Sequence, residues 1–137
     1  MNLIDLLLGE HGQLHALFDA LETLAEREPA PGLLGRVLAH NLLAHSRGEE
    51  ELLFPDLESH IGPQGPLAVM RSEHEHIDTL LEDLETWPRI LELIEVCRRH
   101  FLKEEQVLFP LARQVLDEGR LQALGLQWAH ARGLVPG

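Results

Sequence analysis

The sequence predicts an all-α protein: an antiparallel, up-down-up-down four-helix bundle with a short C-terminal helix. Three observations support this prediction. Apolar or His/Glu positions recur every three or four residues along the chain, and no stretch alternates in twos. The segments with this helical period are joined by short breaks that contain Pro and Gly, which favours antiparallel neighbours. A length of 137 residues leaves room for one domain with one core.

Four long helices are expected, each from a stripe of apolar side chains at helical spacing. They cover about residues 4–24, 34–61, 67–84 and 88–118. The first ends at the sequence EREPAPG, and the second runs toward the turn at Gly62-Pro63. Pro88 suits the first turn of the fourth helix. A shorter stripe around Leu121 and Trp128 predicts a packing helix within a C-terminal appendage of about residues 120–137.

The chain contains two related halves. HSRGEEELLFP (45–55) has the same frame as HFLKEEQVLFP (100–110), and GEHGQLHALFDALET (9–23) overlays SEHEHIDTLLEDLET (72–86). Two copies are too few and too long for a solenoid. We therefore expect one domain over residues 1–137, made of helical hairpins at about 3–60 and 66–118 that are related by approximate twofold symmetry.

Six polar residues fall in register with the apolar stripes and should face the interior. They are His11, His45, Glu49, His74, His100 and Glu104. The two HxxxE pairs each lie on one helix face, because residues four apart are separated by about one turn. Burying imidazole and carboxylate groups is costly unless they are paired or bind a metal. Such donors suit iron, zinc, manganese or copper, and six exceed what one tetrahedral zinc uses, so two metal ions are expected.

The order of these residues resembles the hemerythrin-like, or HHE cation-binding, domain. That family carries one His, then HxxxE, then one His, then HxxxE on four consecutive helices, and its EExxLFP extension occurs here twice. The resemblance implies a hemerythrin-like fold in which the four His residues are terminal ligands of two iron ions. It also implies that Glu49 and Glu104 bridge the irons, together with an oxo or hydroxo group, and that the ligand is dioxygen, peroxide or nitric oxide.

One departure from the family concerns the position four residues after the third-helix His. Oxygen-carrying hemerythrins have a second His there, where this chain has Asp78, while its first helix carries His15 four residues after His11. His15 and Asp78 overlay in the two hairpins, and each is either an additional ligand or a hydrogen-bond partner of a ligand. The loss of that His weakens the case for reversible oxygen carriage.

Other polar residues are expected to be solvated or structural. Those predicted to face solvent are Glu10, Glu50, Glu73, Glu105, His40, His60, His76 and His130. Cys97 overlays Leu42, so we interpret it as a small buried hydrophobe. Pro55 and Pro110 should each kink their helix beyond the site, because each removes a helical hydrogen bond.

Charge and composition narrow the function further. The net charge of −12 opposes binding to nucleic acid or to an anionic membrane. No export signal is visible in the opening residues, the apolar runs are too short to span a membrane and there is a single Cys, so we expect a cytoplasmic protein. Two alternatives to a di-iron protein that binds or reduces an oxidant stay open. One is a metal- or redox-sensing interaction protein, and the other is a bundle that is metal-free or structurally bound to zinc or another divalent metal.

Overall fold

The computed structural model describes residues 1–136, which are helical almost throughout, with no strand in that range. The helices are α1 (Leu3–Leu24), α2 (Gly32–Gly48), η1 (Glu49–Leu53), α3 (Phe54–Ile61), α4 (Pro66–Leu81), α5 (Trp87–Lys103), η2 (Glu104–Leu108), α6 (Phe109–Val115) and α7 (Glu118–Ala131). The elements η1 and η2 are π-helical turns. The predicted all-α fold class is confirmed.

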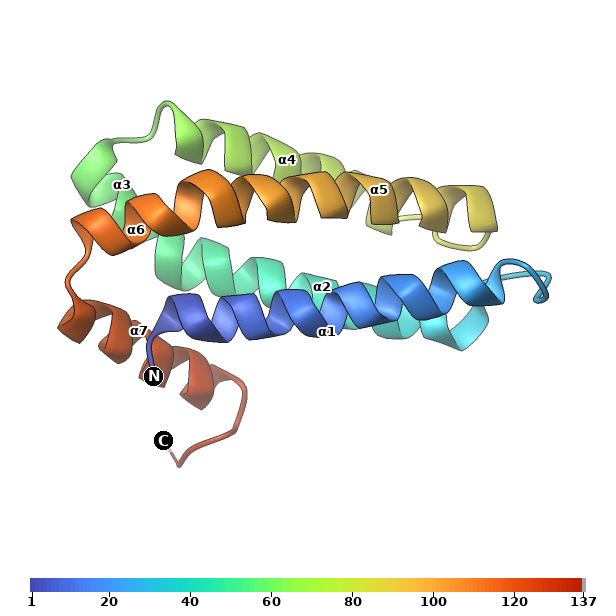
Figure 1. Cartoon of the computed structure of the whole chain (residues 1–137), viewed down its shortest axis with the longest axis horizontal. Helices are drawn as coiled ribbons and strands as arrows, with labels where there is room; N and C mark the ends of the chain where they lie inside the picture. Colours follow the sequence, from blue (N-terminus) through green and yellow to red (C-terminus); the bar gives the residue numbers. More distant parts are fainter. Residues whose placement is uncertain (137) are drawn as a thin grey trace.

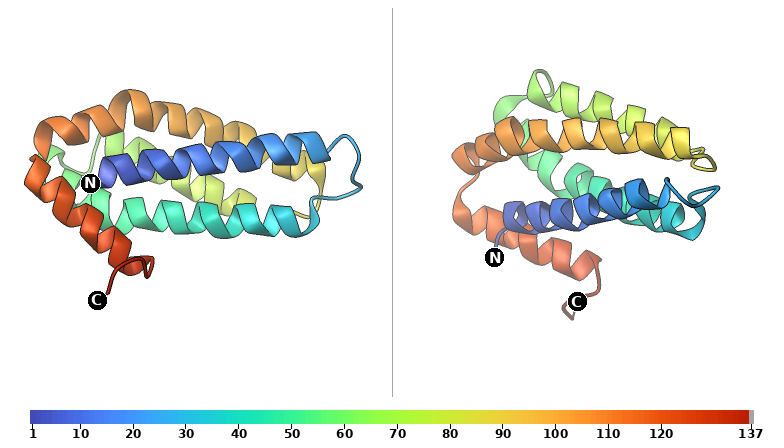
Figure 2. Two further views of the ribbon diagram at one scale, coloured as in Figure 1. Left: turned by 60° about the horizontal axis from the view of Figure 1, so that its bottom comes forward. Right: turned by 45° about the vertical axis from the view of Figure 1, so that its right-hand side comes forward.

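Two long hairpins lie side by side and form the bundle (Figure 1). One hairpin pairs α1 with α2, and the other pairs α4 with α5. The second and fourth long helices continue through η1 and η2 into α3 and α6 at the same end of the molecule. At that end α7 crosses outside the first hairpin and packs against α1 and η1, as the two further views in Figure 2 also show.

The helix ends follow from local backbone chemistry. The Asn2 side chain accepts a hydrogen bond from the Asp5 backbone N–H at 2.9 Å and so caps α1. We predicted that the fourth long helix would reach about residue 118, but the structure ends it at Val115. Leu116 is extended there, and Asp117 starts α7 by accepting a hydrogen bond from the Arg120 backbone N–H at 2.7 Å.

We predicted that Pro55 and Pro110 would each kink their helix beyond the site, but the helix irregularity lies before each Pro and begins at Glu49 and Glu104. In η1 the backbone N–H of Phe54 donates to the carbonyl of Glu49, five residues earlier, and Phe109 makes the same bond to Glu104 in η2. A Pro two residues into a regular turn would clash with the carbonyl four residues before it, and the wider π turn relieves that conflict. The chain therefore widens at the two acidic residues of the HxxxE pairs.

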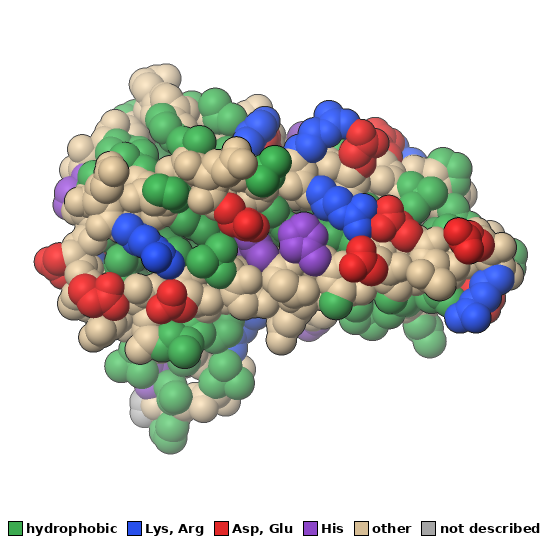
Figure 3. All heavy atoms as spheres, in the orientation of Figure 1, with side chains coloured by type: hydrophobic (Ala, Val, Ile, Leu, Met, Phe, Trp, Pro, Cys, Tyr) green, Lys and Arg blue, Asp and Glu red, His purple; other side chains and the backbone are tan. Residues whose placement is uncertain are grey.

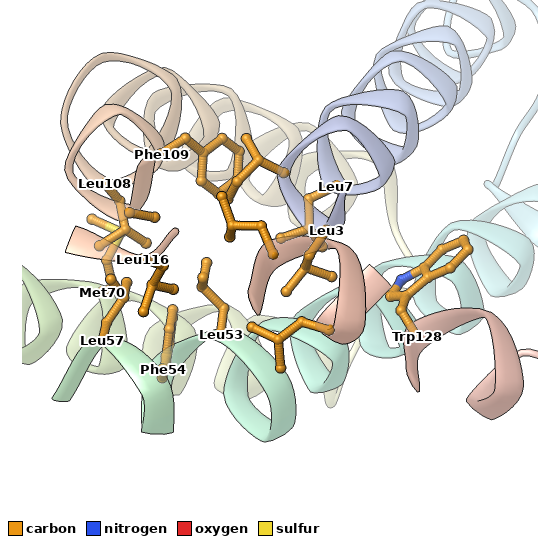
Figure 4. Close-up of a cluster of buried hydrophobic side chains, with 14 of the residues drawn as sticks. Leu3, Leu7, Leu53, Phe54, Leu57, Met70, Leu108, Phe109, Leu116 and Trp128 are labelled. Atoms are coloured by element: carbon orange, nitrogen blue, oxygen red, sulfur yellow. The ribbon is translucent and has the colours of Figure 1, made fainter. Parts of the chain in front are cut away.

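Two apolar clusters fill the interior, one at each end of the bundle. The first gathers side chains from α3, α6, α7 and the start of α1, including Leu3, Phe54 and Trp128 (Figure 4). The second lies nearer the α1–α2 and α4–α5 connections and includes Phe18 and Cys97. Along each long helix the predicted polar ligands lie between members of the first cluster and members of the second. A polar layer therefore separates two dry apolar regions.

Each helix within residues 1–136 is too short or too polar to cross a membrane.

Candidate metal centre

The six predicted ligands come together in the polar layer. His11 lies on α1, His45 on α2, His74 on α4 and His100 on α5, while Glu49 and Glu104 are the first residues of η1 and η2. Each of the six side chains is at most 2% exposed. All six side chains are therefore buried, as the sequence predicted.

These residues form two overlapping groups in which one donor atom from each residue lies within 4.8 Å of the others. The first group contains His11 and His45, from one hairpin, and the second contains His74 and His100, from the other. Glu49 and Glu104 belong to both groups. The arrangement therefore offers two adjacent cation positions with two shared carboxylates.

The distances show how each carboxylate reaches both hairpins. Glu104 Oε1 lies 3.1 Å from His11 Nε2 and 3.5 Å from His100 Nε2. Glu49 Oε1 lies 3.2 Å from His74 Nε2 and 3.5 Å from His45 Nε2. Each Glu is thus close to the His four residues before it and to one His of the opposite hairpin.

Four further Glu residues, which we call the orienting Glu residues, contact the outer nitrogen of the four His rings. His45 Nδ1 lies 2.9 Å from Glu10, His74 Nδ1 2.7 Å from Glu50, His100 Nδ1 2.8 Å from Glu73 and His11 Nδ1 2.8 Å from Glu105. The prediction that these side chains face solvent is confirmed for Glu50 and Glu105, but it is wrong for Glu10, which is buried, and for Glu73, which is half-buried. The contacts of all four with His rings were not predicted. The available signal was their repetition, since each occupies the same place in both halves of the chain.

The orienting Glu residues determine which ring nitrogen carries the proton. An ionised carboxylate can only accept, so each His donates from Nδ1–H, and in a neutral ring Nε2 then carries the free lone pair. All four Nε2 atoms therefore point into the layer as acceptors. His74 Nε2 and His100 Nε2 lie only 3.1 Å apart, so their lone pairs would repel each other unless a cation or a proton lies between them.

Burial controls the protonation of these groups. It lowers the pKa of His11 to about 4, with the neighbouring His45 acting in the same direction. Burial also lowers the pKa of His100, whereas for His74 the effect of burial is outweighed by Glu49 and Glu50, and the pKa is raised. His11 and His100 are thus held as neutral imidazoles, the form in which His can bind a metal.

The two shared carboxylates titrate as a pair. Burial raises the pKa of Glu104 well above its usual value, and the charge of Glu49 adds to the effect. Burial also opposes ionisation of Glu49, but the neighbouring His45 and His74 outweigh it and hold the pKa of Glu49 below its usual value. Without a cation, one member of the pair is therefore protonated.

Several buried nitrogen and oxygen atoms in the layer have no hydrogen-bond partner among residues 1–136. They are His45 Nε2, both carboxylate oxygens of Glu49, and Glu104 Oε2. Leaving such atoms unpaired in a dry interior is costly, and cations between the His and Glu side chains would satisfy them. Imidazole and carboxylate donors together suit iron, manganese, zinc or copper, so the residues present fit a pair of such ions.

His15 and Asp78 lie outside both groups of donor atoms. His15 is half-buried, and its ring lies edge-on to the rings of Phe18 and Phe101. Asp78 is exposed, and its pKa is raised by partial burial and by the charge of Glu50. Histidine and charged side chains reach the surface together in the middle of the face shown in Figure 3. The geometry therefore favours neither residue as a ligand.

The remaining predictions for single residues hold. Cys97 is buried, and burial raises the pKa of its thiol to about 12, so it is an inert apolar filler. The four His residues predicted to face solvent, His40, His60, His76 and His130, are exposed. Sequence reasoning did not single out Phe101, whose ring stacks on His11 with centroids 4.0 Å apart and planes 13° apart.

Comparisons with known proteins agree with this geometry. A "DNA nickase" of Nostoc sp. (strain PCC 7120) is 26% identical over 137 residues, which cover 94% of this chain and 37% of the relative. The "Iron-sulfur cluster repair protein YtfE" of Enterobacter sp. (strain 638) is 34% identical over 96 residues, which cover 56% of this chain and 44% of the relative. The chain thus spans less than half the length of these relatives.

The YtfE protein of Escherichia coli O1:K1 has the same identity and coverage as the Enterobacter protein. No solved structure matches the chain. Residues 2–112 match the family model for the hemerythrin HHE cation binding domain, and that segment contains all six buried His and Glu donors. The chain therefore belongs to the hemerythrin family of HHE cation-binding domains.

Proposed function

We propose that this chain is a non-heme di-iron protein that binds or reduces a small oxidant. The two His residues of each hairpin hold one iron, and Glu49 and Glu104 bridge the two irons. The observation that carries this proposal is the pair of donor groups with both carboxylates in common. A single-metal site would not need four inward-facing imidazoles and two shared carboxylates in one layer.

Binding of a small oxidant needs a free coordination position, which separates iron from a closed zinc site when each position has four protein donors. Structural zinc is complete with four ligands, whereas iron accepts more and keeps positions free. When bound, the iron pair would supply electrons and free coordination positions for dioxygen, peroxide or nitric oxide. The relatives named for iron-sulfur cluster repair are consistent with iron.

The protein's own contribution is orientation, charge and dryness. The orienting Glu residues hold each imidazole with Nε2 inward, which keeps the ligands arranged before metal arrives. Glu104 would release its proton on metal binding, because its pKa is raised by burial and by the charge of Glu49. The apolar clusters on both sides exclude water from the layer.

A difference between the two hairpins indicates from which side a small molecule would reach the centre. Phe101 covers one face of His11, but its counterpart in the other hairpin is the small residue Ser46. Ser46 lines a surface hollow of about 350 Å³ together with Glu50 and Asp78. We therefore propose that small ligands approach the His74 side of the centre through this hollow.

The direct test is metal analysis of protein purified without added metal. The proposal predicts two iron ions per chain, visible absorption from oxygen-bridged ferric iron, and a spectral change on adding hydrogen peroxide or nitric oxide. His45→Ala should lose part of the metal, and an exposed variant such as His40→Ala should keep it all. Two zinc ions per chain without iron, from cells supplied with iron, would reject the proposal in favour of a structural zinc bundle.

A second candidate function follows from the named relatives. Proteins called iron-sulfur cluster repair proteins are 34% identical over 96 residues, so the same iron pair could serve as an iron source for a partner protein. Transfer of iron to a cluster-free iron-sulfur protein, without turnover of peroxide, would favour this role. A nickase activity is not favoured, because the chain covers only 37% of the Nostoc relative and its net charge of −12 opposes contact with a phosphate backbone.

A further inference from the structure

The twofold repeat of the metal centre is broken at one position. In the second hairpin Lys103 precedes Glu104 and forms an ion pair with Glu73, whose other oxygen accepts the His100 Nδ1–H at 2.8 Å. The corresponding residue of the first hairpin is Gly48, which has no side chain. The orienting Glu of that hairpin, Glu10, therefore has no cation from its own repeat.

Arg132, which directly follows α7, provides the cation for Glu10. Its Nη1 lies 2.6 Å from Glu10 Oε2, while Glu10 Oε1 accepts the His45 Nδ1–H at 2.9 Å. Glu10 is only 11% exposed and Arg132 26%, so this ion pair is much less screened by water than a surface pair. A continuous chain of contacts thus runs from the C-terminal appendage to a predicted metal ligand.

The absence of a side chain at Gly48 makes room for this arrangement. A Cβ atom there would lie 3.3 Å from Trp128 Cδ1 and 3.8 Å from Arg132 Nη2. The Arg132 guanidinium lies 4.8 Å from the centre of the Trp128 ring and donates to the Ala44 carbonyl at 2.9 Å. Two contacts therefore hold the guanidinium against Glu10, in space that a longer residue 48 would fill.

The backbone of α7 also places Arg132 there. Gly133 has φ of 69° and ends the helix, with its N–H bonded to the His130 carbonyl and the N–H of Leu134 bonded to the Ala129 carbonyl. At its middle α7 packs so closely on the N-terminal backbone that a Cβ at Gly125 would lie 2.8 Å from the Met1 carbonyl oxygen. The helix is thus docked along its length and ends at the metal layer.

We propose that Arg132 is a positioning residue of the metal centre, supplying from the appendage the cation that Lys103 supplies in the other hairpin. It lies outside residues 2–112, which match the family model. This inference rests on the proposed two-metal function. Removing Arg132 frees Glu10, then loosens His45, and should weaken the metal position of the first hairpin about 10- to 100-fold, as expected for a residue that orients a ligand.

The test is an anaerobic titration of the metal-free chain with cobalt(II), whose visible spectrum reports the geometry of each position. Arg132→Ala should weaken one of the two binding steps and change part of the spectrum. Arg132→Lys, which keeps the charge, should restore most of the affinity. Arg120→Ala is the matched control, because Arg120 also joins α7 to the bundle, through Asp56, but lies away from the layer.

Double variants separate a positioning role from a general loss of stability. The effect of Arg132→Ala should disappear in a His45→Ala background, where the oriented ligand is gone, and persist in a His100→Ala background. If the parent chain binds two cobalt ions and Arg132→Ala binds them equally well, or if Arg120→Ala is equally damaging, the positioning role is wrong and the two-metal function stands. A parent chain that binds fewer than two ions overturns both.

Discussion

Replacing Glu104 by Gln should remove metal from both positions while leaving the bundle folded. The Glu104 carboxylate is 0% exposed, and its Oε1 lies 3.1 Å from His11 Nε2 and 3.5 Å from His100 Nε2, so one oxygen faces a His of each hairpin. A neutral amide of nearly the same shape keeps the packing but withdraws a negative charge from between two cations. A terminal His serves only one ion, so its loss should matter less.

The size of the effect follows from the burial of the site. Removing one partner of a fully buried charge interaction costs about 3–5 kcal/mol. At 1.4 kcal/mol for each factor of ten, metal affinity should fall about 100- to 4,000-fold. Loss of an orienting Glu residue should cost only about 10- to 100-fold. Glu104→Gln should therefore be purified with one metal ion per chain or none.

In the metal-free chain, the same substitution should leave stability against unfolding unchanged or raise it. Burial and the charge of Glu49 raise the pKa of Glu104, so the folded chain holds a proton that the unfolded chain releases above its ordinary pKa. This stabilisation is complete at low pH and is lost as pH rises through the raised pKa. The amide of the Glu104→Gln variant does not ionise, so no charge is buried there at any pH. At neutral pH the metal-free variant should thus unfold at the same temperature as the metal-free parent or higher, with an advantage that grows with pH.

Three measurements test the Glu104→Gln prediction together: metal content, anaerobic titration with iron(II), and thermal unfolding followed by circular dichroism in the presence of a chelator. Glu51→Gln, an exposed carboxylate on η1, is the control and should behave as the parent. Retention of two irons with the parent spectrum would refute the bridging role of Glu104. A metal-free variant that fails to fold would refute the assignment of its effect to metal binding.

Four further predictions follow from the same geometry. His15→Ala and Asp78→Ala should each keep two metal ions and the parent spectrum, because both residues lie outside the donor groups; metal loss in either would restore it as a ligand. Glu50→Gln should weaken only the second-hairpin position, measured by cobalt titration, since it orients His74. Metal affinity should fall as pH drops through the pKa of His74, which its Glu neighbours raise above 6.5, because a protonated imidazole cannot bind metal. Ser46→Phe should slow reaction with peroxide in stopped-flow measurements at unchanged metal content, and Ser46→Ala should not.

The six buried His and Glu residues could be predicted from sequence because their relation is local. A His and a Glu four residues apart share a helix face whatever the rest of the fold does, and the apolar stripe tells which face is buried. The same reasoning placed Cys97 and the exposed His residues correctly. It also explains why the long helices and the α7 segment were predictable, although the end of the fourth long helix at Val115 depends on the extended backbone of Leu116.

The orienting Glu residues could not be found this way. Glu10 is adjacent to His11 and lies about 100° around its own helix, so periodicity places it off the buried stripe. Its partner is His45 on the neighbouring helix, a contact that depends on how two helices pack. The contact of Arg132 with Glu10 was even harder to predict, because Arg132 follows the last turn of α7 and belongs to no repeat. The periodicity of a sequence shows which face of a helix is buried, but it does not show which residues of two helices make contact.

The structure also explains why the HxxxEE frame occurs twice. In each copy the first Glu, Glu49 or Glu104, belongs to both donor groups. The second Glu reaches across: Glu50 orients His74 of the other hairpin, and Glu105 orients the first-helix His of the other hairpin in return. Neither hairpin alone contains the carboxylates that orient all of its own imidazoles. The complete set of oriented imidazoles and shared carboxylates therefore forms only when both hairpins dock.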